Sequence, residues 1–300
     1  MMAQITAALV KALRDRSGAG MMDAKKALVE SDGDMEAAVD WLRAKGLSKA
    51  AKKSGRTAAD GLVAVVVSGD NKSGALIELN AETDFVARNE KFQAAIGEIA
   101  EIALSTDGDV EAVLASAAPD GDGSVEDMIK RLVATIGENM TLRRSAKIEA
   151  DSVSCYVHSA EADGMGKIGV LVGLNGSGDL AEAGRKVAMH VAATSPAAAT
   201  VADLDQELVE REKQILTDQA VESGKPAEVI EKMIGGRLQK FYKEVVLVEQ
   251  PFVMDPDQTV AKFLKAAGAE LVGFKMFKLG EGIDKKEDDF AAEVASMTNA

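Results

Sequence analysis

Cysteine, histidine and long apolar runs are scarce in this sequence of 300 residues. Cys155 is the only cysteine, so an intramolecular disulfide is excluded, and His158 and His190 are too few for a histidine-rich metal site. The longest apolar run, residues 62–67, is far too short to span a bilayer, and the amphipathic first sixteen residues lack the apolar core of a secretion signal. We therefore expect a cytoplasmic protein with no membrane contact and no metal or other cofactor.

Positive charge is also in short supply, because 35 lysines and arginines face 49 aspartates and glutamates, for a net charge of -14. Nucleic-acid binding requires a broad cationic surface, so we expect no direct nucleic-acid contact. The sequence contains no Gly-x-x-x-x-Gly-Lys-Ser/Thr motif of a nucleotide-binding P-loop. Cys155 and His158 lie three positions apart in a predicted strand, which turns them to opposite faces, and we expect Cys155 to be buried. No pair of carboxylates is singled out as an acid and base, so an enzyme is not predicted.

Alternating helical and strand patterns predict an α+β fold. In the first fifty residues, apolar side chains recur at helical spacing in three short segments, separated at residues 18–20 and at Asp34, which predicts a three-helix bundle. Residues 43–56 then carry six basic side chains and no acidic one. We interpret them as a solvated linker, with a local contact to an anionic partner as the alternative.

The remainder of the chain alternates between β-branched runs and amphipathic segments. Two runs on either side of a Gly-Asp-Asn turn predict a β-hairpin, and two apolar stripes joined through residues 222–226 predict a helical hairpin. Strands are predicted at residues 62–67, 75–80, 141–148, 153–159, 168–175, 245–248 and 270–278, and helices at 89–104, 125–137, 180–193, 204–245 and 258–267. Residues 105–124 are predicted to be a loop, His190 is expected to face the core, and a final amphipathic helix carries Phe290.

One pattern of strand, loop and helix occurs twice at a constant offset of 95 residues. Residues 75–80 align with 170–175, and Asp84, Phe85 and Phe92 then fall on Asp179, Leu180 and Val187 without a gap. This repetition predicts a core built from two similar α+β halves.

Phe85 is one of only eleven aromatic residues (eight Phe, two Tyr and one Trp), and it lies in a polar loop beside Asp84. Burying its ring would draw the neighbouring carboxylate inward, which favours an exposed ring that inserts into a partner. The alternative, in which Phe85 begins a helix as a buried residue like Leu180, stays open. Met21 and Met22 follow a glycine-rich turn, where they form either the bundle core or an adaptable contact with another protein.

Several segments resemble the bacterial translation elongation factor Ts family, in the family's order and over the whole chain. The most specific are Gly18-Ala-Gly-Met-Met and Thr83-Asp-Phe-Val, and the others are residues 5–14, 136–139, 188–193, 250–253 and 289–293. The resemblance implies a guanine nucleotide exchange factor that promotes GDP release from elongation factor Tu. It also implies a ubiquitin-associated-like (UBA-like) bundle at residues 1–55, a two-part core at 56–150 and 151–280, a helical hairpin inserted at about 203–245, and a C-terminal docking helix at 281–300.

The same resemblance implies roles for individual residues. The family's insertion loop corresponds to Thr83, Asp84, Phe85 and Val86, with Asp84 and Phe85 entering near the Mg2+ site of the GTPase. Further partner contacts fall on Met21, Met22, Phe290 and His158, which we also interpret as an exposed strand-end residue. Ala24 stands where many members carry cysteine, and residues 106–124 do not match, so no role is carried over to them. A homodimer through the helical hairpin is left open, and the alternative function is a non-enzymatic adaptor that binds partners through its UBA-like bundle.

Overall fold

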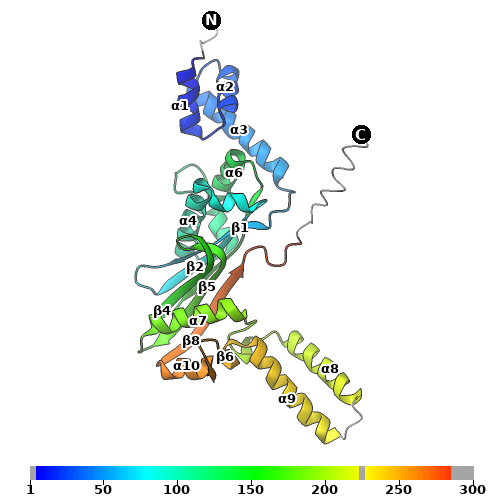
Figure 1. Ribbon diagram of the computed structural model, residues 1–300. Coiled ribbons are helices and arrows are strands. Elements are labelled where there is room, and N and C mark those ends of the chain that lie inside the picture. Colours follow the sequence, from blue (N-terminus) through cyan, green and yellow to red (C-terminus); the bar gives the residue numbers. More distant parts are fainter. Residues whose placement is uncertain (1–4, 223–226, 285–300) are drawn as a thin grey trace.

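Three helices form the N-terminal part of the computed structural model, which describes residues 5–222 and 227–284 (Figure 1). They are α1 (Ala7–Ser17), α2 (Met21–Glu30) and α3 (Met35–Lys53). The side chains of Thr6 and Asp34 cap α1 and α3, because each accepts a hydrogen bond from a backbone amide of the first turn. The apolar faces of the helices meet in a small buried cluster of Val10, Leu13, Ala24, Ala27, Leu28 and Ala38.

α3 continues without a break to Lys53, so the prediction of a linker over residues 43–56 was wrong for most of its length. The last turns of α3 pack against α6 (Val125–Ile136), and Ala50 is buried in the main core. Lys52 and Lys53 belong to the last turn, where a positive charge interacts favourably with the negative end of the helix dipole. The basic run therefore fits the end of a long helix.

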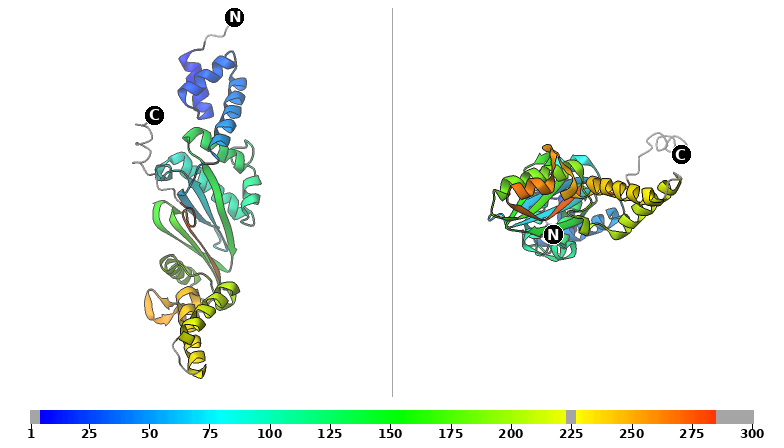
Figure 2. Two further views of the ribbon diagram at one scale, coloured as in Figure 1. Left: turned by 90° about the vertical axis from the view of Figure 1, so that its right-hand side faces the viewer. Right: turned by 90° about the horizontal axis from the view of Figure 1, so that it is seen from below.

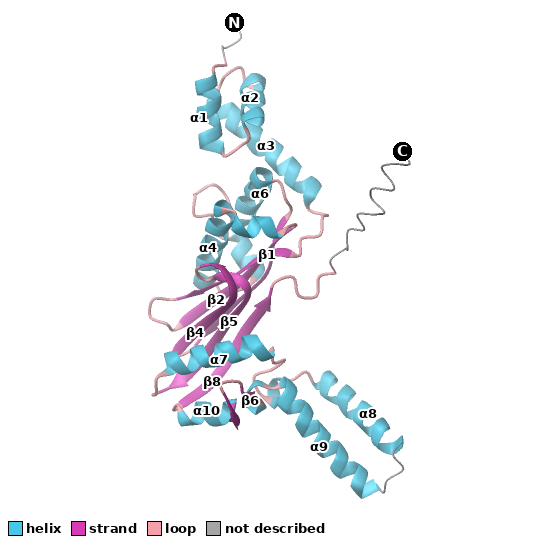
Figure 3. Ribbon diagram, in the orientation of Figure 1, coloured by secondary structure: helices cyan, strands magenta, loops and turns pink. Residues whose placement is uncertain are grey.

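Six strands of the described chain form one antiparallel sheet, so the protein has an α+β fold (Figure 3). β1 (Asp60–Val67), β2 (Ser73–Ala81) and β3 (Met140–Glu149) make one half, and β4 (Ser152–Ala162), β5 (Met165–Gly176) and β8 (Ala269–Lys278) make the other. The halves join where the first residues of β5 pair with β1, Gly166 opposite Val63 and Met165 opposite Ala64. The predictions of these six strands are confirmed, with ends shifted by a few residues.

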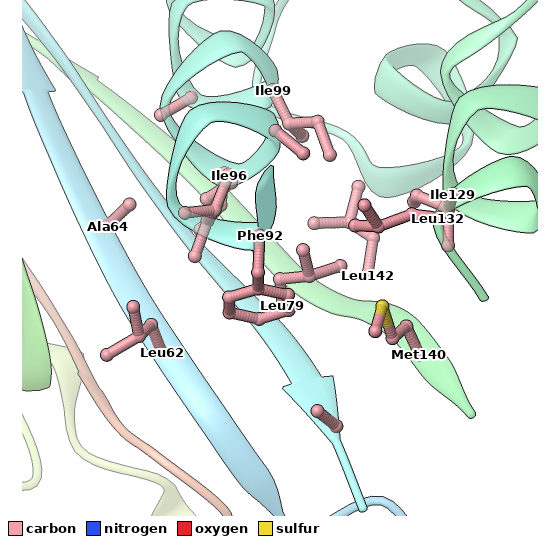
Figure 4. Close-up of a cluster of buried hydrophobic side chains, with 14 of the residues drawn as sticks. Leu62, Ala64, Leu79, Phe92, Ile96, Ile99, Ile129, Leu132, Met140 and Leu142 are labelled. Carbon is pink, nitrogen blue, oxygen red and sulfur yellow. The ribbon is translucent and has the colours of Figure 1, made fainter. Parts of the chain in front are cut away.

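Alternate residues along the strands face two different apolar layers. On β1, Leu62 and Ala64 pack beneath α4 (Glu90–Ser105) and α6, in the cluster drawn in Figure 4. Val63 and Val65 face the other way, and they pack with Leu171 of β5. The two halves of the sheet therefore stack face to face, and each keeps its outer side for helices.

The second half of the sheet has its own outer layer, formed by α7 (Leu180–Thr194) and α10 (Val260–Ala266). Val170 and Val172 of β5 pack there with Val187 and Val191 of α7. His190 of the same helix is 1% exposed, which confirms that it faces the core. Its Nε2 lies 2.8 Å from the side-chain oxygen of Gln250, and burial lowers the pKa of His190.

Three further segments differ from the predictions. Residues 245–248 do not form a strand, because only Val246 makes a bridge, to Ala198, before the 3-10 turn Leu247–Glu249. The predicted loop at 105–124 contains α5 (Val110–Ala115), a single short helix that Asp109 caps. A small ribbon of β6 (Pro251–Phe252) and β7 (Asp255–Thr259) was not predicted, and its strands are too short to show a period.

Glu78 is a charged residue with no exposed surface, on β2 between the two halves of the sheet. It accepts hydrogen bonds from the guanidinium groups of Arg143 and Arg144 on β3, and from the backbone amide of Gly280 at 2.8 Å. Gly280 adopts a left-handed conformation, and a Cβ on it would collide with the carbonyl oxygen of Ala59. The turn that follows β8 is thereby fixed next to the start of β1.

α8 (Gln206–Glu222) and α9 (Ala227–Val245) lie side by side and project away from the sheet, at the end of the molecule opposite to α1–α3 (Figures 1 and 2). At their base, Leu204 and Val209 pack with Leu238 of α9 in a separate buried cluster. Leu208 and Ile215 are exposed. None of the helices in the described residues has the length and apolar character that a membrane crossing needs.

Candidate functional site

The loop predicted to enter a partner lies between the end of β2 and the start of α4. Residues Asp84–Arg88 form a 3-10 turn there, in which Val86 and Ala87 are 4% and 0% exposed within the main core. Phe85, by contrast, is 80% exposed, so the alternative in which it is a buried helix residue is wrong. Val86 anchors the turn, whereas Asp84 and Phe85 form its surface.

The second copy of the pattern explains why only Phe85 turns outward. α7 begins directly at Leu180, which is 9% exposed. In the first copy the helix begins only at Glu90, because the side chain of Asn89 accepts hydrogen bonds from two amides of the first turn and caps it. The position that matches Asn89 is Gly184, inside α7. Asparagine favours helix starts over helix interiors, so α4 starts late and the preceding turn carries Phe85 outward.

Met21 and Met22 begin α2 on the surface of the bundle, where they are 49% and 76% exposed. Neither belongs to the buried cluster of the bundle, so the alternative that they form its core is wrong. The turn that precedes them lies beside the first turn of α4, since a Cβ placed on Gly18 would be 3.3 Å from Lys91 Nζ. The start of α2 and the Phe85 turn therefore both approach the same end of α4.

His158 is exposed on β4, and its Nδ1 lies 3.3 Å from the hydroxyl oxygen of Tyr156. The end of β4 contacts the Phe85 turn through an ion pair between Arg88 and Glu161, with 3.5 Å between Nε and Oε2. His158 thus lies on the strand that touches this turn. Phe290, the remaining predicted contact, lies outside the described residues.

Cys155 is exposed on β4, and the prediction of a buried cysteine was wrong. β4 is an edge strand of the described sheet, and α7 covers its other face, where the Ser154 hydroxyl donates a hydrogen bond to the carbonyl of Ala181. The part of the chain that the structure describes has no group of three or more histidines, cysteines, aspartates or glutamates placed to hold a metal ion.

The side chains that hold the loop were missed by sequence reasoning. Thr83 donates its backbone amide and its hydroxyl to the carboxylate of Glu138, at 2.9 and 2.7 Å. Glu82 accepts a hydrogen bond from the backbone amide of Asn139 and forms an ion pair with Arg56. The only signal for these contacts was that residues 136–139 resemble a family segment, which carried no role.

Comparisons with known proteins agree with the motifs. The family model described as Elongation factor TS matches residues 82–281. The Elongation factor Ts of Hyphomonas neptunium is 69% identical over 298 residues, which cover 99% of each chain. Those of Caulobacter vibrioides and Parvibaculum lavamentivorans are 56% and 55% identical, over 99% and 98% of this chain and 99% of theirs.

These matches define the class first: the chain is a translation elongation factor, with a role in protein biosynthesis. Within that class, it belongs to the elongation factor Ts family. The resemblance inferred from the motifs is thereby confirmed.

Proposed function

We propose that the protein is a guanine nucleotide exchange factor for elongation factor Tu, and that it releases GDP by placing Phe85 and Asp84 against the Mg2+ and phosphate site of the GTPase. The observation that carries the proposal is the 80% exposure of Phe85 on a turn whose next two residues are buried. Family membership supports the reaction, and the exposed ring supports the residue. The direct test is to measure release of fluorescent GDP from purified elongation factor Tu with and without this protein.

The mechanism needs no bond chemistry from this chain. A GTPase holds GDP through Mg2+ and through contacts to the phosphates, so an exchange factor must bind the nucleotide-free state more tightly than the loaded state. Burying the Phe85 ring in the partner contributes about 1.5 to 3 kcal/mol, which is available only if the elements around the phosphate site move apart. Because the coupling is reciprocal, a newly bound nucleotide expels the factor.

Asp84 precedes the ring and is exposed on the same turn. Inserted with Phe85, its carboxylate brings negative charge towards the Mg2+ ion and its ligands, which disturbs the coordination without replacing a ligand. The ion and the nucleotide belong to the GTPase, so the exchange factor itself works without a cofactor.

The proposal extends to the rest of the chain. Met21, Met22 and His158 are assigned as further partner contacts, as is Phe290, which lies outside the described residues. Residues 1–55 are assigned as a UBA-like bundle, and 56–150 and 151–280 as the two parts of the core with the hairpin inserted in the second. Residues 281–300 are assigned as a C-terminal docking helix, and 285–300 lie outside the described residues. The protein is proposed to act in the cytoplasm, and the hairpin is the proposed site of any homodimer.

Met22→Ala should weaken binding to elongation factor Tu about fivefold, through loss of the most exposed apolar side chain of α2. The maximal rate of GDP release should stay unchanged, because the Phe85 turn is untouched. Val29→Ala is the matched control, since Val29 is 54% exposed on the same helix and has no predicted contact. The measurement is a titration of fluorescent GDP release, and equal effects of both variants would remove Met22 from the interface.

Replacing residues 213–235 by a short Gly/Ser linker should leave GDP release largely stimulated. The variant keeps Val209 and Leu238, which pack at the base of the hairpin, and the Phe85 turn lies on the other half of the sheet. Circular dichroism would check the fold, and light scattering before and after the replacement would test the homodimer. If a folded variant lost exchange completely, the outer part of the hairpin would have to grip the GTPase itself.

A further inference from the structure

Residues 82–83, which follow β2, and residues 138–139, which precede β3, are joined by hydrogen bonds to each other's carboxylates. Ala81 pairs with Met140 at the ends of these strands, which places residues 82–83 opposite residues 138–139. Glu138 accepts two hydrogen bonds from Thr83, and Glu82 accepts one from the backbone amide of Asn139 at 2.5 Å. Each segment therefore offers a side-chain carboxylate to the backbone of the other, and hydrogen bonds to a charged acceptor are stronger than those between neutral groups.

Thr83 stands at the cap position of the 3-10 turn that carries Phe85, yet its side chain makes no capping hydrogen bond to that turn. A threonine at a cap position ordinarily bonds to the amides of the turn that follows it. Here the hydroxyl and the backbone amide both point to the one carboxylate of Glu138. Thr83, two positions before Phe85, is therefore held by a residue outside the turn. The buried Val86 holds the chain directly after Phe85.

The hydrogen-bonded segments 82–83 and 138–139 also contact the residues that end and follow α3. Arg56 pairs with Glu82 at 3.3 Å, and its carbonyl accepts a hydrogen bond from the side chain of Asn139 at 2.7 Å. Lys53 donates a hydrogen bond to the carbonyl of Gly137, which ends α6. Glu138 thus lies between the helix that carries the N-terminal bundle and the turn that carries Phe85.

We propose that Glu138 is a positioning residue for exchange: by accepting hydrogen bonds from both donors of Thr83, it fixes the direction in which the Phe85 side chain points away from the core. This inference rests on the proposed function. A ring that is already held in its inserting direction loses less conformational freedom when it enters the phosphate site, so the gain falls on the release step rather than on association. Glu138 acts through Phe85 and does not itself touch the nucleotide site.

Glu138→Ala should lower the maximal rate of GDP release about tenfold and leave the half-saturating concentration within about twofold, because the other contacts with the GTPase are kept. Thr83→Val, which removes only the hydroxyl, should lower the rate less and keep the fold if Glu138→Ala does not. Glu90→Gln is the charge control, since it removes an exposed carboxylate at the start of α4 without touching Thr83, and it should match the wild type.

The decisive measurement is the double variant with Phe85→Ala. If Glu138 acts through the ring, adding Glu138→Ala to Phe85→Ala should change the release rate no further. A further loss by the same factor, or a wild-type maximal rate in Glu138→Ala alone, would overturn the proposal.

A second readout separates this proposal from the proposed function. Hydrogen exchange of the Thr83 amide in the free protein should be faster in Glu138→Ala than in the wild type, and unchanged in Glu90→Gln. If the wild type failed to stimulate GDP release, the proposed function would be wrong. The amide exchange would still test whether Glu138 holds Thr83. Equal protection of the Thr83 amide in all three proteins would show that Glu138 does not hold Thr83, and would overturn this proposal whatever the release rates.

Discussion

Replacing Phe85 by alanine should slow stimulated GDP release about tenfold or more while leaving the protein folded. The ring is 80% exposed in the free protein, so its removal takes little from the folded core. In the proposed complex the ring is buried in the GTPase, and a loss of about 1.4 kcal/mol or more in the exchange-competent state corresponds to the tenfold change. The measurement is the rate of fluorescent GDP release at saturating concentrations of the variant.

Two control substitutions define what the Phe85 result means. Val253→Ala removes a side chain that is 51% exposed on the β6–β7 ribbon, and it should exchange GDP like the wild type. Phe92→Ala removes a ring with no exposed surface, and it should destabilise the fold by about 3 to 5 kcal/mol. A wild-type rate of GDP release with Phe85→Ala would disprove the proposed insertion of the ring. A loss of stability like that of Phe92→Ala would make Phe85 a core residue.

Glu78→Ala should lower the free energy of unfolding by about 3 kcal/mol, the low end of the range for breaking a buried ion pair. The substitution leaves the guanidinium groups of Arg143 and Arg144 without their shared carboxylate, and it removes the acceptor for the Gly280 amide. Both arginines retain partial contact with water, at 29% and 25% side-chain exposure, which keeps the loss from being larger. Urea unfolding followed by circular dichroism would measure it.

Glu149→Ala is the matched control for Glu78. Glu149 pairs with Lys147 on the same strand as the two arginines, but its side chain is 70% exposed. Exposed pairs of this kind contribute about 0 to 1 kcal/mol. If the two variants lost equal stability, the buried carboxylate would have no special part in holding the two halves of the sheet and the turn after β8.

Local patterns predicted the elements of this fold well where a period extends over enough residues. The six strands of the central sheet and the helices that cover it follow from alternation and helical spacing, and all six strands were found. The linker prediction fails at the end of α3 because a run of basic residues resembles a solvated linker, whereas the helix continues through Ala50 into the core. A short element such as the β6–β7 ribbon has no period to detect.

The candidate site was only partly accessible from the sequence. Phe85 was distinguished by its polar neighbours and by its mismatch with Leu180 in the second copy. No local pattern indicates Glu138, because its partner Thr83 lies 55 positions away in the sequence. Glu78 does stand out in the sequence, because it interrupts an apolar run on β2 and the matching position in the second copy is Gly173.

The contact between Gly280 and Ala59 has a consequence for avidity. The chain enters the central sheet at Ala59 and leaves it at Gly280, so the segments before and after the core are attached at one corner. The Phe85 turn is joined to that corner through Arg56 and Glu82. If each of these segments contacts the GTPase, as proposed, binding of one brings the others to it at the high effective concentration of an intramolecular reaction. Contacts that are individually weak can therefore sum to a tight complex and still be released one at a time when nucleotide returns.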